Sequence, residues 1–330
     1  MVKVLITGAT GFLGGALVAR LLNDGIEVAA LVRNPEKIEN HGIAVYQIDL
    51  ENLVELKEII IQNKLIDSNT TVIHCAAVLG AAQASKKTYI KINVEASFAL
   101  FEISNQLKAN KFVFISSMSA AGPIGSLEDP ITEDMIGKPR SYYGWSKYEA
   151  EQNMINYLER TIPLIVVRPP VIFGPGMNPK SGAALLFNGC KRRIFGIIGG
   201  GNNYINLVYI DNLVNGIIVC ADSVTVGYEI FFISDNVPYR VMEIIDRIKE
   251  ELKTNTMIIK FPYLLLLPFA WLTEKFGKLI RRDIGFNVEL VKGMATYAFL
   301  FSIYKAKKAG YNPNISLDEG IKKTVNYLSR

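Results

Sequence analysis

Short apolar runs alternate with amphipathic stretches along the first half of the chain. The runs are about four to eight residues long and rich in β-branched residues, which is typical of buried strands. They predict strands at residues 2–6, 26–33, 44–50, 71–77 and 111–117. The stretches between them have helical apolar spacing and predict helices at residues 15–22, 52–64 and 89–109. Strands that alternate with helices in this way indicate an α/β fold built on a doubly wound parallel sheet.

A glycine-rich turn, Gly8-Ala9-Thr10-Gly11-Phe12-Leu13-Gly14, joins the first predicted strand to a helix. Strand, glycine-rich turn and helix, in this order, form a dinucleotide-binding fingerprint. In it, Gly8 permits the tight turn, Gly11 leaves room for a pyrophosphate, and Gly14 lets the helix lie close to the sheet. The free N–H groups at the helix N-terminus then favour the phosphates. The alternative is an ordinary strand-to-helix turn, but the position of the motif favours a cofactor site.

Polar residues stand at the ends of the predicted strands, namely Thr7, Arg33, Asp49, Ser116 and Ser117. Ligands of open α/β sheets bind beyond the carboxyl ends of the strands, so these residues are expected at one edge. At the end of the second strand an acidic residue accepts hydrogen bonds from the ribose of NAD, whereas an arginine accommodates the 2′-phosphate of NADP. Arg33 therefore favours NADP over NAD, unless it is an ordinary solvated loop arginine.

The pattern changes after the strand predicted at 164–168, because two prolines follow it and proline cannot continue a central ladder. Residues 174–204 are rich in glycine and are interpreted as substrate-side loops. Residues 206–221 predict a short strand and a helix, and 229–234 a strand that returns to the sheet. Residues 238–330 are expected to be mostly helical. We therefore expect a Rossmann-type domain at 1–173 and 205–236, and a smaller, mostly helical C-terminal substrate-binding region at 174–204 and 237–330.

Composition excludes several other classes of protein. Half of the 330 residues are hydrophobic, a fifth are charged and the net charge is +5, which fits a soluble globular chain of one large domain or two smaller ones. No dense basic block suggests nucleic acid. Three scattered cysteines and two histidines lack metal-ligand spacing, so no metal is expected. The odd cysteine count suits a reducing compartment, and the chain starts directly with a strand, so we expect no signal peptide and a cytoplasmic location.

Tyr143 and Lys147 lie four residues apart in a predicted helix that begins at Ser141, so they share one face. Tyr142 falls off that face. A tyrosine has an ordinary pKa near 10, and a nearby ammonium would lower it enough for acid–base chemistry. Alone, this spacing is also common in surface helices.

Together these features resemble an extended short-chain dehydrogenase/reductase, the superfamily of NAD-dependent epimerases/dehydratases and 3β-hydroxysteroid dehydrogenases. The resemblance runs nearly end to end. It is carried by TGATGFLG at 7–14, Asp49, HCAA at 74–77, Asn93, SSMSAAGP at 116–123, YGWSK at 143–147, RPPVIFGPG at 168–176, YIDNL at 209–213 and KAKKAGYNP at 305–313.

By this resemblance Tyr143 is the acid/base, Lys147 holds the nicotinamide ribose and lowers the tyrosine pKa, and Ser117 hydrogen-bonds the reacting oxygen. Most members form homodimers, which we expect here too. The resemblance assigns cofactor contacts to Gly8, Thr10, Gly11, Phe12, Leu13, Gly14, Arg33, Asp49, Leu50, Ala76, Ala77, Asn93, Tyr143, Lys147, Pro170 and Val171. His74 is interpreted as a packed strand residue rather than a catalytic one.

Two reactions use the same serine, tyrosine and lysine. A reductase or dehydrogenase exchanges a hydride with a cofactor that dissociates, whereas a nucleotide-sugar epimerase retains its cofactor throughout. Sugar-nucleotide relatives often carry Arg-Asp where this chain has Ile205 and Asn206, although Lys191 or Arg192 could compensate. Met118-Ser119 replaces the acidic pair of the dehydratases. We therefore expect an NAD(P)-dependent oxidoreductase of a secondary alcohol and ketone, on an apolar substrate similar to a hydroxysteroid or dihydroflavonol. The alternative is a nucleotide-sugar 4-epimerase.

A cofactor-sensing regulator on the same fold is a third hypothesis. It is disfavoured, since such relatives commonly lack the Tyr-Lys pair.

The most apolar stretch, residues 261–272, contains two prolines and is too short to span a membrane. Lys275, Lys278, Arg281 and Arg282 follow it. A buried wall of the substrate pocket or a subunit contact is the favoured interpretation. The alternative is a peripheral membrane contact through 261–282.

Overall fold

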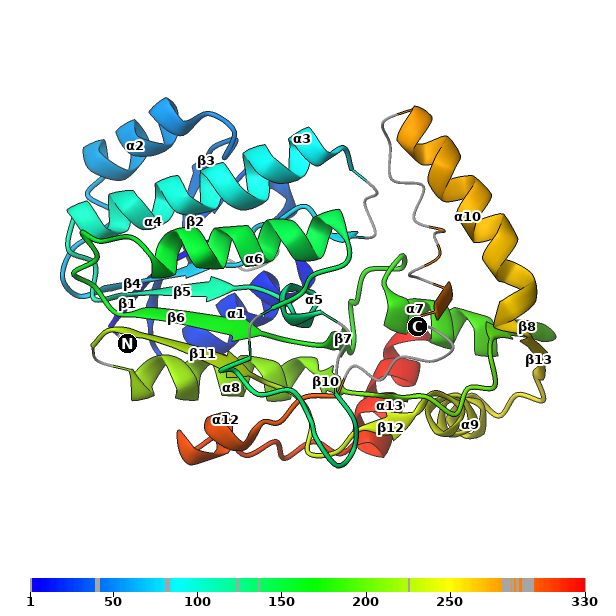
Figure 1. Ribbon diagram of the computed structural model, residues 1–330. Coiled ribbons are helices and arrows are strands. Elements are labelled where there is room, and N and C mark those ends of the chain that lie inside the picture. Colours follow the sequence, from blue (N-terminus) through cyan, green and yellow to red (C-terminus); the bar gives the residue numbers. More distant parts are fainter. Residues whose placement is uncertain are drawn as a thin grey trace.

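Seven parallel strands form the central sheet of the computed structural model (Figure 1), in the order β11-β6-β5-β4-β1-β2-β3. The structure describes residues 2–38, 42–80, 84–122, 125–135, 137–224, 226–280, 286, 288, 291–292 and 300–329. Pro123, Arg281 and Arg282 of the motifs above lie outside these residues, as does the side chain of Lys278. The strand order is that of the Rossmann fold, so the predicted fold class is confirmed.

The sheet strands are β1 (Lys3–Thr7), β2 (Glu27–Val32), β3 (Ala44–Gln47), β4 (Thr70–His74), β5 (Lys111–Ile115), β6 (Leu164–Arg168) and β11 (Tyr228–Phe232). β4, β5 and β6 are buried at every position, as expected for parallel strands covered on both faces. β3 ends before Asp49, which lies in the following loop, and β11 returns to the sheet edge beside β6, as predicted.

Three small two-stranded sheets lie outside the main one. They pair β7 (Val171–Phe173) with β10 (Leu207–Tyr209), β9 (Tyr204–Ile205) with β12 (Tyr239–Arg240), and β8 (Ile194–Ile198) with β13 (Met257–Phe261).

The helices cover both faces of the sheet and build the C-terminal region. They are α1 (Phe12–Asn23), η1 (Pro35–Lys37), α2 (Leu53–Gln62), α3 (Lys86–Tyr89), the π-helix η3 (Ile90–Ala96), α4 (Ser97–Gln106), α5 (Met118–Ala121), α6 (Tyr142–Ile155), α7 (Gly182–Cys190), α8 (Ile210–Ser223), α9 (Val241–Leu252), α10 (Tyr263–Leu279), α12 (Tyr304–Lys308) and α13 (Leu317–Leu328).

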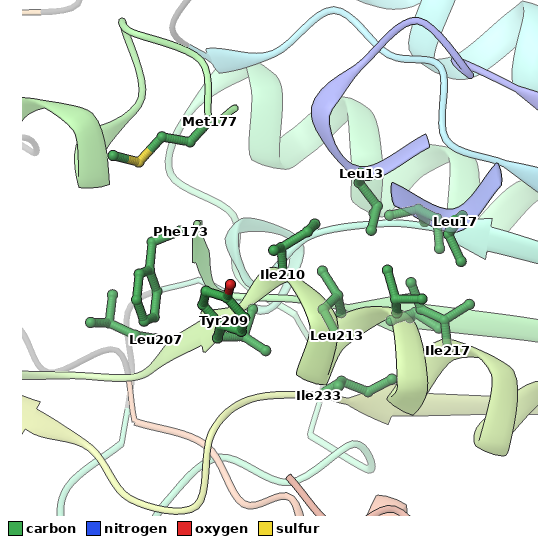
Figure 2. Close-up of a cluster of buried hydrophobic side chains, with 14 of the residues drawn as sticks. Leu13, Leu17, Phe173, Met177, Leu207, Tyr209, Ile210, Leu213, Ile217 and Ile233 are labelled. Atoms are coloured by element: carbon green, nitrogen blue, oxygen red, sulfur yellow. The ribbon is translucent and has the colours of Figure 1, made fainter. Parts of the chain in front are cut away.

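Two hydrophobic clusters, one on each face of the sheet, form the core. α2, α4 and α6 cover one face, and α1 and α8 cover the other (Figure 1). In Figure 2, Leu13 and Leu17 of α1 approach Leu213 and Ile217 of α8. The same cluster continues through Phe173 and Leu207 to Met177, so the sheet and the segment that follows β7 share one apolar core. The predicted division into two domains stays a prediction.

The prediction of loops throughout 174–204 was wrong, because this segment contains α7 and β8. Ser181 caps α7 by accepting a hydrogen bond from the Ala184 N–H at 3.2 Å, and Ala183, Ala184 and Phe187 bury one helix face. Glycines at 182 and 189 gave this segment the composition of a loop. One of them is required: a Cβ on Gly189 would lie 2.6 Å from the Phe195 ring of β8.

Residues 261–272 were expected to form a buried pocket wall or a subunit contact. The prediction of a buried wall was wrong, and the subunit contact stays a prediction. Phe261 ends β13, and α10 begins at Tyr263 and runs along the outside of the molecule (Figure 1). Leu264, Leu265 and Phe269 are each more than 60% exposed. Within the described residues, no helix is long and apolar enough to cross a membrane.

Candidate active site

A cleft of about 600 Å³ opens at the carboxyl ends of the sheet strands, within the size range of cofactor and small-molecule sites. Every predicted cofactor and catalytic residue except Asn93 lines it. They come from the α1 turn, the ends of β2, β4 and β5, helix α6 and the segment after β6: Gly8, Thr10, Gly11, Phe12, Leu13, Gly14, Arg33, Asp49, Leu50, Ala76, Ala77, Ser117, Tyr143, Lys147, Pro170 and Val171.

The glycine-rich turn has no room for side chains at two of its positions. Gly8 has φ +74°, and a Cβ there would lie 2.7 Å from the Ala76 amide nitrogen. A Cβ on Gly14 would lie 2.1 Å from the Gly8 carbonyl oxygen. The turn therefore holds the start of α1 directly against β1 and the end of β4.

The N-terminus of α1 faces this cleft with free backbone donors. Gly11 is the N-cap and has no side chain to accept hydrogen bonds from the first turn, which carries no acidic residue. Unpaired N–H groups and the positive end of the helix dipole suit an anion. These residues fit the pyrophosphate of a dinucleotide.

At the adenosine end of the cleft, Arg33 and Lys37 both line the wall and are exposed. The Asp49 carboxylate accepts a hydrogen bond from the Glu51 N–H at 3.1 Å, which fixes the loop after β3. A bound nucleotide would therefore meet two cations and one carboxylate here.

Helix α6 carries the predicted catalytic pair. Ser141 caps the helix by accepting a hydrogen bond from the Gly144 N–H at 3.0 Å. A Cβ on Gly144 would lie 2.4 Å from the Ser119 carbonyl oxygen, so α6 packs tightly against α5, which follows β5. This contact brings Tyr143 next to Ser117, with which its phenol forms a hydrogen bond. Ser117 in turn accepts a hydrogen bond from the Ser119 N–H at 3.2 Å.

The expectation that Lys147 lowers the pKa of Tyr143 does not hold in this structure. Burial raises the pKa of Tyr143 to about 12, and the hydrogen bond with Ser117 only partly opposes it. The Lys147 ammonium instead donates to the Ile115 carbonyl oxygen at 2.8 Å and lies 4.6 Å from the centre of the Phe114 ring. Burial lowers the pKa of Lys147 to about 8. At neutral pH the tyrosine is therefore a neutral phenol, able to donate a proton.

Asn93 lies beneath the cleft rather than on its wall. Its side chain accepts from the Val78 N–H at 2.8 Å and donates to the Val78 carbonyl at 2.9 Å and to the Ser146 hydroxyl at 3.0 Å. Asn93 thus ties the loop after β4 to the catalytic helix, next to Lys147. Asn93 was predicted to contact the cofactor directly, but in this structure it instead positions Val78, which lines the cleft.

His74 is fully buried, in agreement with its interpretation as a packed residue. Its ring nitrogens hydrogen-bond the hydroxyls of Thr7 at 2.6 Å and Ser97 at 2.8 Å. Burial, and secondarily the charge of Lys147, lowers the pKa of His74 to about 3, so the ring is neutral.

A buried ion pair beside Ser116 was not predicted. Arg168 donates to both carboxylate oxygens of Glu151, at 3.0 and 2.6 Å, and the Ser116 hydroxyl donates to the same carboxylate. Glu151 follows Tyr143 and Lys147 at spacings of four on the same face of α6, which was the available signal. The pair joins α6, which carries Tyr143 and Lys147, to the ends of β5 and β6.

The strand order and the glycine-rich turn define a Rossmann-type dinucleotide-binding protein. The chain belongs to the NAD dependent epimerase/dehydratase family, which it matches over residues 4–233. These are the extended short-chain dehydrogenases/reductases, as the sequence motifs indicated.

Relatives of both expected kinds are similar over almost the whole chain. A decarboxylating sterol-4-alpha-carboxylate 3-dehydrogenase of Dictyostelium discoideum is 28% identical, covering 97% of this chain and 99% of the relative. A UDP-glucose 4-epimerase of Vibrio cholerae is 26% identical, covering 98% and 94%. The crystal structure of a UDP-glucuronic acid 4-epimerase from Bacillus cereus in complex with NAD superimposes with a TM-score of 0.78 at 21% identity, over 99% and 98% of the two chains.

Proposed function

We propose that the chain is an NAD(P)-dependent oxidoreductase that interconverts a secondary alcohol and a ketone on an apolar substrate. The observation that carries the proposal is the contact between Tyr143 and Ser117 at the cleft wall, beside the residues that fit a dinucleotide. Two hydroxyl groups directed at one position can hold a single substrate oxygen.

Bound NAD(P) would supply or accept the hydride. In the reductive direction, Ser117 donates a hydrogen bond that polarises the carbonyl oxygen, and Tyr143 donates its proton to the oxygen as it becomes an alkoxide. The raised pKa of Tyr143 keeps that proton in place at neutral pH. Lys147, four residues along α6, would hold the nicotinamide ribose. Pro170 and Val171 also line the cleft.

The positions that would bind the diphosphate of a sugar nucleotide are occupied differently here. Asn206 is buried, donates to the Ser234 hydroxyl at 3.2 Å and accepts from the Phe301 N–H at 3.2 Å, so its side chain is fully used within the core. Ile205 carries no charge. Lys191, which could have compensated, is exposed and donates to the Leu328 carbonyl at 3.2 Å, and neither it nor Arg192 is among the described residues that line the cleft. This arrangement favours an apolar substrate.

A nucleotide-sugar 4-epimerase is the second candidate, supported by the Vibrio cholerae relative. The two reactions differ in whether the cofactor leaves. For a dissociable cofactor, Arg33 and Lys37 favour NADP, because both cations can pair with a 2′-phosphate. Purified protein that arrives without nicotinamide and binds NADPH more tightly than NADH would support the oxidoreductase. Tightly retained NAD would support the epimerase.

The chemistry itself is tested by Tyr143→Phe in a screen of hydrophobic ketones and UDP-sugars. Loss of the proton donor should lower kcat by about 10²- to 10⁴-fold, while the dissociation constant of the cofactor changes little. Tyr142→Phe is the matched control, because Tyr142 is 43% exposed and does not line the cleft. Equal activity of the Tyr143→Phe and wild-type enzymes would contradict the proposed role.

A further inference from the structure

In α10, the exposed residues from Leu264 to Leu272 are all apolar. Its outward residues recur at helical spacings of one, three and four residues and include Leu264, Leu265, Phe269, Trp271, Leu272 and Phe276. The residues that face the protein, such as Leu266, Leu267 and Ala270, are also apolar. A helix that is apolar on all sides is normally surrounded by protein or lipid.

The two-stranded sheet before α10 extends this apolar surface. Met257, Ile259 and Phe261 alternate along β13 and are exposed, and Ile194, the partner of Met257 on β8, is half exposed. Ile258, between them, packs toward the core instead. Strand alternation therefore places three large side chains on the solvent side of this sheet. We name the exposed residues of β13 and α10 the apolar face.

Basic residues are frequent in the sequence of the apolar face and just after it. The segment 257–282 contains Lys260, Lys275, Lys278, Arg281 and Arg282, against a single acidic residue, Glu274. The Lys275 ammonium lies 5.5 Å from the centre of the Trp271 ring, among the exposed apolar side chains. A long basic side chain in this position can bury its methylene groups in lipid and direct its charge to the headgroups. Among the described side chains, Lys260 and Lys275 are exposed. Their charges complement an anionic surface and would repel one another across a symmetric contact between two copies of this chain.

We propose that the apolar face docks on an anionic lipid bilayer, with α10 lying in the interface rather than spanning it. Trp and Tyr residues favour such interfaces, and Trp271 and Tyr263 belong to this helix. In Figure 1, α10 lies beyond α7 on the side of the molecule to which the sheet strands point. Docking would thus bring the cleft close to a lipid phase, where an apolar alcohol or ketone dissolves. Only the supply of an apolar substrate from the lipid rests on the proposed function; the docking itself does not.

The test is co-sedimentation of the full-length protein with vesicles of phosphatidylcholine, with and without phosphatidylglycerol. We expect binding to the anionic vesicles that weakens as salt rises. The Leu265→Ser/Phe269→Ser double variant should lower the partition coefficient at least about tenfold. Lys275→Glu should lower it about fivefold, and only for vesicles that contain phosphatidylglycerol.

A matched control replaces exposed apolar residues outside the apolar face. Val54→Ser/Leu158→Ser changes two residues that are 71% and 99% exposed, on α2 and after α6, and should leave binding unchanged. Trp271→Phe should remove the blue shift of tryptophan fluorescence on vesicle binding but not the binding itself. Circular dichroism and NADPH titration show whether each variant is folded.

Absence of wild-type binding to either kind of vesicle overturns the proposal. If the protein instead forms dimers that Leu265→Ser/Phe269→Ser dissociates, the apolar face belongs to a second copy of the chain. Failure of docking and failure of the proposed function are distinguishable. Vesicle binding without turnover of any ketone leaves the docking intact, whereas turnover of water-soluble ketones without vesicle binding leaves the reaction intact.

Discussion

Phe112 and Phe269 are the same residue type, but the sheet region buries its phenylalanine whereas α10 exposes it to solvent. Phe112, in β5, is fully buried and packs edge-on against the Phe101 ring, with the ring centres 5.3 Å apart. Phe269, in α10, is 64% exposed. The sheet region buries its apolar side chains within the protein, whereas α10 presents apolar side chains outward. Apolar content alone therefore does not show what covers a segment.

Among the polar contacts of the sheet region, we expect the largest effect from breaking its buried ion pair. Glu151→Gln leaves the Arg168 guanidinium buried without a counter-charge, which should lower the free energy of unfolding by about 3–5 kcal/mol. The control, Glu319→Gln, removes a pair with Lys323 in which both side chains are nearly half exposed, and should cost less than about 1 kcal/mol. Urea denaturation measures both. Equal costs would mean that the burial of the first pair has no energetic consequence.

A smaller effect is expected from the glycine-rich turn. Gly14→Ala forces a Cβ to within 2.1 Å of the Gly8 carbonyl oxygen, so α1 must shift, at a cost of about 1–3 kcal/mol and with weaker NADPH binding. Gly15→Ala is the control on the same helix, because its Cβ would lie 3.4 Å from the Ala9 carbonyl oxygen. It should be neutral or stabilising, by up to about 1 kcal/mol, through helix propensity. Thermal unfolding and cofactor titration distinguish the two variants, and similar behaviour would show that close packing at Gly14 is not needed.

His74 should make the sheet region sensitive to acid. Its pKa is about 3 in the folded protein, against the ordinary histidine value of 6.5 in the unfolded chain, so between these values the unfolded chain binds a proton that the folded protein does not. Stability therefore falls as pH falls through this window, by about 1.4 kcal/mol per pH unit from this group. His74→Gln removes the contribution. The difference in unfolding free energy between wild type and variant should shrink between pH 6.5 and 4, and a constant difference would contradict the buried neutral ring.

The smallest effect is expected on α10. Phe269→Ala should change the free energy of unfolding by less than about 0.5 kcal/mol, because the side chain is already mostly in water. Phe112→Ala, its counterpart in the sheet, should cost about 3–5 kcal/mol. Chemical denaturation of the two variants in parallel measures the contrast directly. A large cost at Phe269 would mean that α10 is packed more tightly than its exposure indicates.

Local patterns in the sequence predicted the sheet and most of the cleft. Strand alternation, helical spacing and the glycines at 8 and 14 depend on neighbours a few residues away, so they can be read from the chain directly. Helix α7 was not predicted, because the glycines of this segment indicated a loop more strongly than the N-cap at Ser181 indicated a helix. The pairing of Glu151 with Arg168 and the raised pKa of Tyr143 could not be predicted, since both depend on burial among elements distant in sequence. Homodimer formation and a cytoplasmic location stay predictions.

The last part of the chain has a consequence for synthesis on the ribosome. Tyr311 is buried against α8 and donates its hydroxyl to the Ser234 carbonyl oxygen at 2.9 Å, and Asn212 of α8 donates to the Ile315 carbonyl at 2.8 Å. A Cβ on Gly320 of α13 would lie 2.8 Å from the Tyr209 ring. The layer that covers one face of the sheet is thus completed by residues 311–320, which are translated well after α8. A nascent chain would expose that apolar layer until residues 311–320 leave the exit tunnel, and would be prone to aggregate during this interval.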